Sequence, residues 1–137
     1  MKKQLERNEN RGMRIKTVNT IFYCRKWEET VRFYRDHLKL TVNFSTDWFV
    51  EFCLNTTCRL SIADEKRAII KSGNGKGITL SLEVENIDNV REFVEKAGLK
   101  PTMIKKHPWG AMVFYLFDPE AHRIEIWQSV NMRMRKI

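Results

Sequence analysis

The hydrophobic pattern of the chain changes from the period of a strand to that of a helix and back again. Residues 14–24 are rich in β-branched and aromatic side chains, which is typical of a strand. Residues 27–40 then place apolar side chains at helical spacing. Three short strand-like runs follow, in residues 40–46, 47–54 and 58–64. The first half of the chain therefore predicts the order β-α-β-β-β.

The second half repeats the same order of elements. Residues 77–86 alternate between apolar and polar positions, and residues 87–98 show a helical stripe that ends at Gly98, where a C-cap is expected. Three further strands are predicted in residues 100–106, 111–118 and 122–128. The "RLSI" of the first half aligns with the "RIEI" of the second. This repetition predicts two copies of one structural unit.

The predicted fold is α+β, with two tandem β-α-β-β-β modules that form a curved mixed sheet around a cleft. The apolar strand faces pack under the helices, which cover the outer face, and the other strand faces line the cleft. The domain from residue 14 to 128 divides into a first module, a linker and a second module, and each end carries a basic tail. These parts cover residues 14–64, 65–77 and 78–128, with the tails at residues 1–13 and 129–137.

The composition narrows the class of protein without naming a function. A chain of 137 residues with 42% hydrophobic residues is long and apolar enough for one domain with a core. The net charge of +8 lies mainly in the tails: residues 1–16 carry six basic against two acidic groups, and residues 133–137 carry three basic groups. The part between them has a net charge of about +1, so we expect solvated tails rather than a nucleic-acid groove.

The cysteines and the hydropathy pattern predict a cytoplasmic protein. Three cysteines make an odd count without the spacing of a disulfide framework, so reduced thiols are expected. No apolar run is long enough for a membrane span, and the N-terminus lacks the apolar segment of a secretory signal.

Strand parity predicts which side chains line the cleft. Positions that alternate with the core-facing residues mix aromatic and polar groups, as small-molecule pockets do. A plain solvent-exposed sheet surface remains the alternative, because parity alone does not separate the two. The predicted ligand-binding residues are Asn19, Tyr23, Phe49, Glu51, Arg59, Ser61, Thr79, Ser81, Trp109, Tyr115 and Trp127, with Glu125 as the candidate catalytic residue.

The two modules, "FY" late in the first helix, "PWG" at residues 108–110 and the closing "FDPEAHRIEIWQ" resemble the vicinal-oxygen-chelate superfamily. This group contains glyoxalase I, bleomycin-resistance proteins and extradiol dioxygenases. The resemblance covers roughly residues 14–128, and its most specific part is the Asp-Pro turn with the strand that follows. Ala121 stands where the family pattern commonly has glycine, which predicts a turn that is either slightly different or strained.

The resemblance also implies four positions for metal ligands, and only one of them matches. They fall on Asn19, Ser61, Thr79 and Glu125, of which Glu125 alone is a residue that metal-dependent members use. A catalytic divalent ion needs about three strong protein ligands. We therefore expect no metal and no other cofactor. A zinc site at Cys53 and Cys58 is a weaker alternative, because it lacks a second pair of ligands.

The leading hypothesis is a metal-free protein, resembling the bleomycin-resistance branch, that binds a small neutral or anionic molecule in the cleft. Aromatic molecules are among the candidates, and the resemblance implies a homodimer. One alternative is a metal-dependent lyase, isomerase or dioxygenase that uses Glu125, and another is an interaction protein with basic tails. Glu125 itself is either a general base or a carboxylate paired with Arg59 or Arg123 that orients a ligand.

Overall fold

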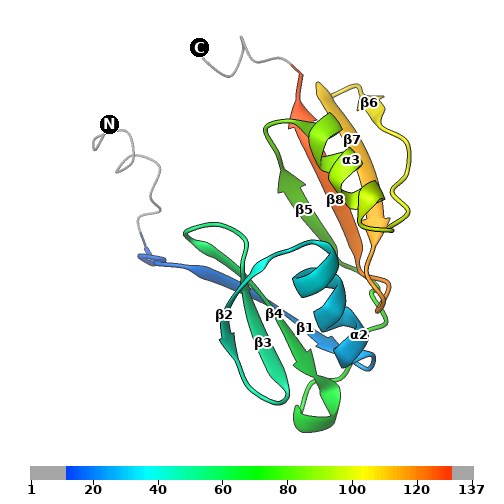
Figure 1. The fold of residues 1–137 in the computed structure, drawn as a ribbon. Coiled ribbons are helices and arrows are strands. Elements are labelled where there is room, and N and C mark those ends of the chain that lie inside the picture. The colour runs from blue at the N-terminus through cyan, green and yellow to red at the C-terminus, as the bar shows by residue number, and fades with distance from the viewer. Residues whose placement is uncertain (1–11, 131–137) are drawn as a thin grey trace.

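The computed structural model describes residues 12–130 and confirms the repeated order of elements (Figure 1). The first module is followed by a short 3-10 helix in the linker, and the second module then repeats the first. The elements of the first module are β1 (Val18–Cys24), α2 (Trp27–Arg32), β2 (Thr41–Ser45), β3 (Phe49–Cys53) and β4 (Cys58–Asp64). The second module contains β5 (Thr79–Glu83), α3 (Ile87–Lys96), β6 (Lys105–His107), β7 (Ala111–Phe117) and β8 (Arg123–Ser129).

Each module has its own mixed sheet. The strand order is β1-β4-β3-β2 in the first module and β5-β8-β7-β6 in the second. In both, the first and last strands pair in parallel and the remaining pairs are antiparallel. Among residues 12–130, β1 and β5 each pair with one neighbour only, so the two sheets are not joined into one by hydrogen bonds. Both modules thus have an open edge at their first strand.

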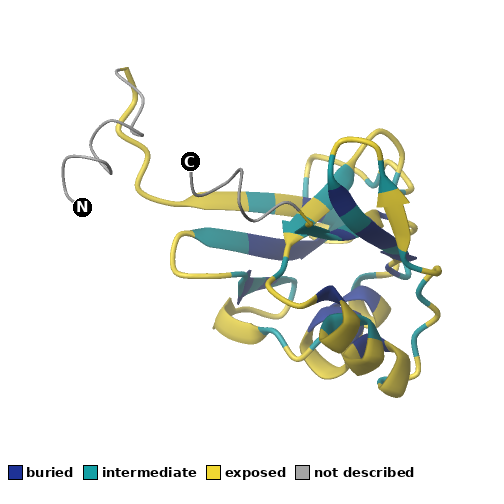
Figure 2. Cartoon of the chain, turned by 90° about the horizontal axis from the view of Figure 1, so that it is seen from above, coloured by how far each residue is buried: buried dark blue, intermediate teal, exposed yellow. Residues whose placement is uncertain are grey.

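One helix covers one face of each sheet, and the core lies between them. Figure 1 shows α2 and α3 on the same side of their sheets, and Figure 2 shows the buried residues concentrated between strands and helices. The strand residues that face the helices are almost fully buried, including Phe52, Leu60, Phe114 and Ile124. Within residues 12–130, the opposite face of each sheet carries no helix. We call it the helix-free face.

The helix predicted in residues 27–40 is shorter than expected. The α-helix ends at Arg32, and a π-helix (Phe33–His37) follows it. The chain then leaves the helix through Lys39, whose φ of 60° lies in the left-handed region. The second helix ends at Lys96, close to the predicted boundary, and Gly98 follows it with a φ of 88°.

A buried polar cluster joins the two modules. The turn between β7 and β8 contributes Asp118 and His122, and both side chains are buried. The hydroxyl of Tyr34, in the first module, donates a hydrogen bond of 2.7 Å to Asp118 Oδ2. His122 Nδ1 lies 2.8 Å from the same oxygen, and its ring stacks on Phe22 at 3.9 Å between centroids. We call these residues, together with Glu120, the module joint.

Glu120 extends the module joint to the start of α2. Its carboxylate accepts hydrogen bonds of 2.7 and 2.8 Å from the backbone N–H groups of Arg25 and Lys26, and it contacts the hydroxyl of Ser72. Burial raises the pKa of Glu120, but these hydrogen bonds to the charged form outweigh it and hold the pKa below its ordinary value. The carboxylate therefore stabilises the joint in its ionised form.

The linker packs directly against the strained turn. Ala121 has a φ of 72°, which confirms the strain predicted from its place in the family pattern. Gly75 has a φ of 77°, and a Cβ atom at this position would collide with the backbone carbonyl of Ala121. Only glycine fits there without displacement of the turn. Within residues 12–130, no helix has the length and apolarity that a membrane crossing requires.

Replacement of Gly75 by alanine is expected to destabilise the protein more than the same change at Gly77. Both glycines have a φ near 75°, so both variants lose about 1–2 kcal/mol from the left-handed backbone. Gly77 has open space around it, and only Gly75→Ala adds a collision with Ala121. Urea denaturation of the two variants measures the difference. Equal losses would show that the linker does not need to approach the turn.

The module joint also predicts a loss of stability in acid. Because the pKa of Glu120 is lower in the folded protein than its ordinary value of 4.5, its contribution is complete above that value. The contribution is lost as the pH falls through the folded pKa. We expect Glu120→Gln to be less stable than the wild type at neutral pH and to lose less stability on acidification, as measured by urea denaturation across pH.

The exposed Glu85 provides the control for this experiment. Glu85→Gln removes the same charge without touching the module joint, so its stability should follow the wild-type dependence on pH. Parallel pH profiles for Glu120→Gln and the wild type would contradict the assigned role of Glu120.

Candidate functional site

The helix-free face of the first module carries a pair of hydrogen-bonded polar side chains. Asn19 on β1 and Ser61 on β4 lie on neighbouring strands, where Asn19 pairs with Arg59 and Ile21 with Ser61. The Ser61 hydroxyl donates a hydrogen bond of 2.7 Å to Asn19 Oδ1, and Ser61 is fully buried. One hydrogen bond therefore joins these two side chains.

The charges on this face are also paired. Arg59 Nε lies 3.7 Å from Glu51 Oε2, and the guanidinium donates to the backbone carbonyls of Asn55 and Thr56. Glu51 additionally contacts the amide of Asn43. The first module thus presents a face whose polar groups have partners within the module.

The two aromatic residues predicted on this face, Phe49 and Tyr23, lie at one end of it, where both strands pair with Ala63. Phe49 contacts Phe44 and Trp48, with ring centroids 6.4 and 5.6 Å apart. Tyr23 is half-buried and lies on the same face of β1 as Ile21. Phe44 and Ile21 are exposed, although both are large and apolar. The face is therefore partly hydrophobic.

Glu125 is the centre of a second polar group, on the helix-free face of the second module. The Ser81 hydroxyl donates a hydrogen bond of 2.6 Å to Glu125 Oε1, and the Tyr115 hydroxyl lies 3.2 Å from Oε2. Burial raises the pKa of Tyr115, and the negative charge of Glu125 and its hydrogen bond raise it further. Tyr115 therefore remains a hydroxyl donor to Glu125 at neutral pH.

Arg123 lies beside this group without forming an ion pair with it. Its Nε donates a hydrogen bond of 3.0 Å to Thr79 Oγ1, and the guanidinium carbon lies 4.8 Å from the centre of the Tyr115 ring. No salt bridge connects Glu125 to an arginine within residues 12–130. Within this part of the chain, Glu125 therefore does not form the ion pair with Arg59 or Arg123 that was one of the two alternatives. Two hydroxyls hold the carboxylate instead.

Aromatic rings surround the far end of β8. Trp109 contacts Trp127 edge-on, with ring centroids 5.5 Å apart, and His107 lies 5.8 Å from Trp109. Trp109 belongs to the turn between β6 and β7, where Gly110 has a φ of 90°, and its side chain is 58% exposed. The turn thus places a tryptophan beside Trp127, at the end of the helix-free face.

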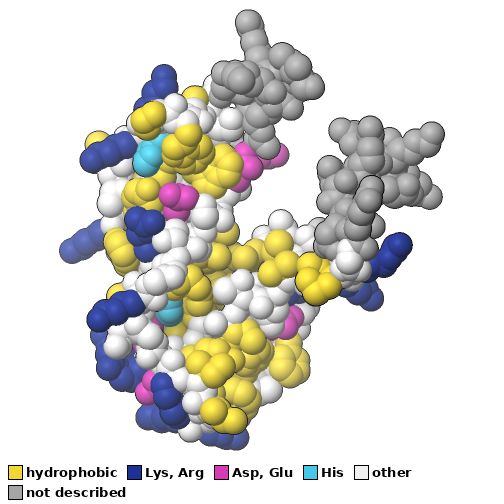
Figure 3. Space-filling view, turned by 180° about the vertical axis from the view of Figure 1, so that it is seen from behind, with side chains coloured by type: hydrophobic (Ala, Val, Ile, Leu, Met, Phe, Trp, Pro, Cys, Tyr) yellow, Lys and Arg dark blue, Asp and Glu magenta, His cyan; other side chains and the backbone are white. Residues whose placement is uncertain are grey.

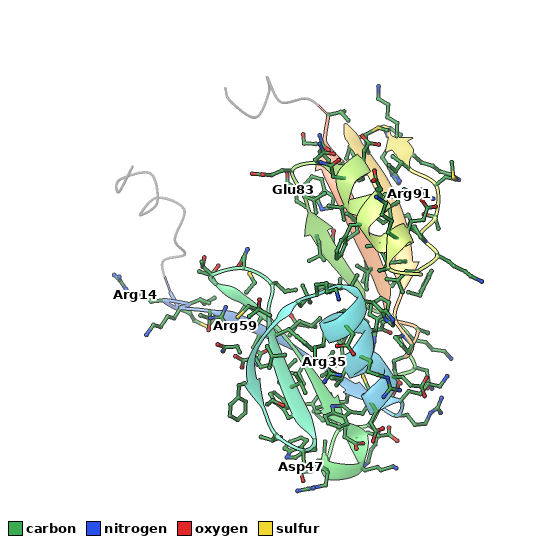
Figure 4. All side chains as sticks on the ribbon, viewed as in Figure 1. Arg14, Arg35, Asp47, Arg59, Glu83 and Arg91 are labelled. Atoms are coloured by element: carbon green, nitrogen blue, oxygen red, sulfur yellow. The ribbon has the colours of Figure 1, made fainter. Side chains whose placement is uncertain are left out.

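The predicted site residues form two groups, one in each module. Asn19, Glu51, Arg59 and Ser61 interact within the first module, and the group around Glu125 interacts within the second. No hydrogen bond or ion pair within residues 12–130 joins the two groups. Figure 4 labels Arg59 and Glu83 on the two separate modules. Figure 3 shows the molecule hollowed between the modules, with hydrophobic side chains gathered on both.

The donors at the four family positions do not fit a divalent metal ion. Asn19 and Ser61 bond to each other, and Thr79 accepts a hydrogen bond from the cationic Arg123. Glu125 is the only charged donor, and a guanidinium beside the third position would repel a cation. Residues 12–130 contain no cluster of three or more histidine, cysteine, aspartate or glutamate side chains that could hold a metal. Cys24, Cys53 and Cys58 are free thiols.

Comparison with known proteins agrees with this architecture. The family model described as a glyoxalase-like domain matches residues 17–131, which is most of the chain. The chain belongs to this family. It is placed in the glyoxalase, bleomycin-resistance and dioxygenase superfamily, as the resemblance predicted. No curated protein matches the chain.

Solved structures share the fold at low sequence identity. A glyoxalase/bleomycin resistance protein/dioxygenase from Nocardioides is 17% identical with a TM-score of 0.69, over 96% of this chain and 92% of that one. The antibiotic binding protein TnmS3 from Streptomyces sp. CB03234 is 15% identical with a TM-score of 0.68, over 82% and 94%. Lactoylglutathione lyase from Agrobacterium tumefaciens is 17% identical with a TM-score of 0.68, over 81% and 91%.

The structure shows interactions of residues that were not among the predicted site residues. Arg123 shares its strand face with Glu125 and Trp127, and the alternation of "RIEIW" contains this signal. The role of Tyr34, Glu120 and His122 in the module joint has no comparable signal, because it depends on contacts between residues more than 80 positions apart.

Proposed function

We propose that this glyoxalase-like protein binds a small neutral or anionic molecule, aromatic molecules included, without a metal ion. The observation that supports this most directly is the setting of Glu125. Its carboxylate accepts hydrogen bonds from Ser81 and Tyr115, and aromatic rings lie farther along the same strand. A few oriented polar groups beside flat apolar surfaces are what small-molecule sites require.

The donor set favours binding over metal chemistry. The two hydroxyls keep Glu125 in place without a metal, and Arg123 adds a positive charge to the same face. A similar fold serves as an antibiotic binding protein in TnmS3, and we infer a comparable, non-catalytic role here. Three free thiols fit a reducing compartment, so we place the protein in the cytoplasm.

We also propose that the protein is a homodimer in which the helix-free faces of two copies meet. β1 and β5 have open edges, and open strand edges pair readily with another chain. Exposed apolar side chains, Ile21 and Phe44 in one module and Trp109 and Phe117 in the other, lie on this face. With the first module of one copy opposite the second module of its partner, the two polar groups would border one cavity.

Metal analysis combined with a thermal-shift screen tests the binding proposal. We expect protein purified without chelators to contain far less than one divalent ion per chain. Small neutral or anionic molecules should raise the melting temperature without added metal. A ligand at one hundred times its dissociation constant stabilises the folded state by about 2.7 kcal/mol.

Glu125→Ala should remove this ligand effect, whereas Glu85→Ala, at an exposed position, should keep it. Stoichiometric zinc, manganese or iron that is lost in Glu125→Ala would contradict the proposal. That result would favour a metal-dependent lyase, isomerase or dioxygenase.

Sedimentation equilibrium tests the dimer. We expect Ile21→Lys to weaken association, because it places a charge on the helix-free face next to the open edge of β1. Ile69→Lys is the control, because the substitution makes the same change of charge at a residue that is 98% exposed and lies in the linker, outside both sheets. A monomeric wild-type protein, or equal association of the two variants, would count against a dimer built on this face.

A further inference from the structure

Strand β8 presents three chemically different side chains in a row on the helix-free face. Arg123, Glu125 and Trp127 alternate with the buried Ile124 and Ile126. Side chains two residues apart on a strand emerge about 7 Å from each other. A guanidinium, a carboxylate and an indole therefore follow one another along the strand.

The two charges in this row are not used to neutralise each other. The partners of Glu125 are the neutral hydroxyls of Ser81 and Tyr115. Within residues 12–130, the Nε of Arg123 has a hydrogen-bond partner, and its two terminal nitrogens have none. A carboxylate offers about four acceptor sites, so Glu125 retains capacity for a further donor. One strong acceptor and one anion-binding group are thus available side by side.

The packing around Tyr115 keeps the two charges close together without contact. The guanidinium of Arg123 lies over the Tyr115 ring, and the hydroxyl of the same tyrosine holds Glu125. Beyond Glu125, Trp127 is half-buried and is contacted by Trp109. Along the strand, a group that can bind an anion (Arg123) is therefore followed by a hydrogen-bond acceptor (Glu125) and an aromatic surface (Trp127).

We propose, resting on the proposed function, that β8 recognises an aromatic carboxylate with a hydrogen-bond donor between its ring and its carboxylate, such as an N-aroyl amino acid. The ring lies against Trp127, the N–H donates to Glu125, and the carboxylate binds the terminal nitrogens of Arg123. Simple cations would meet repulsion from Arg123 at the same place. Aromatic molecules without polar groups would make no contact with the charged groups of Arg123 and Glu125.

Isothermal titration calorimetry of the full chain with N-benzoylglycine and three analogues tests this class of ligand. N-acetylglycine lacks the ring, N-benzoyl-N-methylglycine lacks the N–H, and the methyl ester of N-benzoylglycine lacks the negative charge. Each deletion is expected to weaken binding by about ten-fold or more, because each removes one of the three contacts. Failure of N-benzoylglycine to bind, or equal binding of the methyl ester, would overturn the proposal.

Two variants assign the contacts to their residues. Arg123→Gln should abolish the preference for N-benzoylglycine over its methyl ester, and Glu125→Gln should reduce the preference over the N-methyl analogue. Lys106→Gln is the matched control for Arg123→Gln, because it removes the same charge from the opposite face of the same sheet. Equal weakening by Arg123→Gln and Lys106→Gln would reduce the effect of Arg123 to overall charge and overturn the assignment.

The outcomes separate this inference from the proposed function. If other molecules stabilise the protein through Glu125 while N-benzoylglycine does not bind, the ligand class is wrong and the binding function stands. Sedimentation of Arg123→Gln adds a further check. Loss of self-association in that variant would assign the guanidinium to contacts between copies, and the ligand contact would be excluded.

Discussion

The arrangement of the two modules depends on the carboxylate of Asp118. This buried group accepts hydrogen bonds from the Tyr34 hydroxyl in the first module and from the backbone N–H groups of Glu120 and His122 in its own turn. A buried carboxylate without such donors would cost several kcal/mol. The turn, with Ala121 at a φ of 72°, supplies two of these donors itself, and the first module supplies the third through Tyr34.

The module joint connects the modules near the point where β1 leads into α2, and it leaves the helix-free faces of both sheets uncovered. Glu120 fixes the start of α2 and Gly75 admits the linker beneath the turn, so the joint uses the core side of both modules. The groups around Asn19 and Glu125 lie on the other side, in separate sheets. Polar contacts thus hold the chain together at the joint, while the candidate site gains its stability from pairs within each module.

Periodicity predicted the fold well because each module repeats the same local pattern. The alternation in "RIEIW" placed Ile124 and Ile126 in the core and Glu125 and Trp127 on the opposite face, as the structure has them. The partners of Glu125 could not be predicted, since Ser81 and Tyr115 come from two other strands whose register depends on the whole sheet. The π-helix after Arg32 was missed because its spacing imitates a continuing α-helix.

The same register explains why the family's fourth ligand position survives here in a different setting. Glu125 lies between Ser81 and Tyr115, so two hydroxyls replace the neighbours that would be needed to share a metal ion. Arg123 lies two residues earlier on the same face and donates a hydrogen bond to Thr79 Oγ1. The hydroxyl at the third position therefore accepts from a guanidinium instead of facing a metal ion. The residue at one strand position thus affects what its cross-strand neighbour can bind, because paired side chains such as Arg123 and Thr79 lie on the same face of the sheet. The fold keeps the carboxylate in place, and the residues paired with it determine what it can bind.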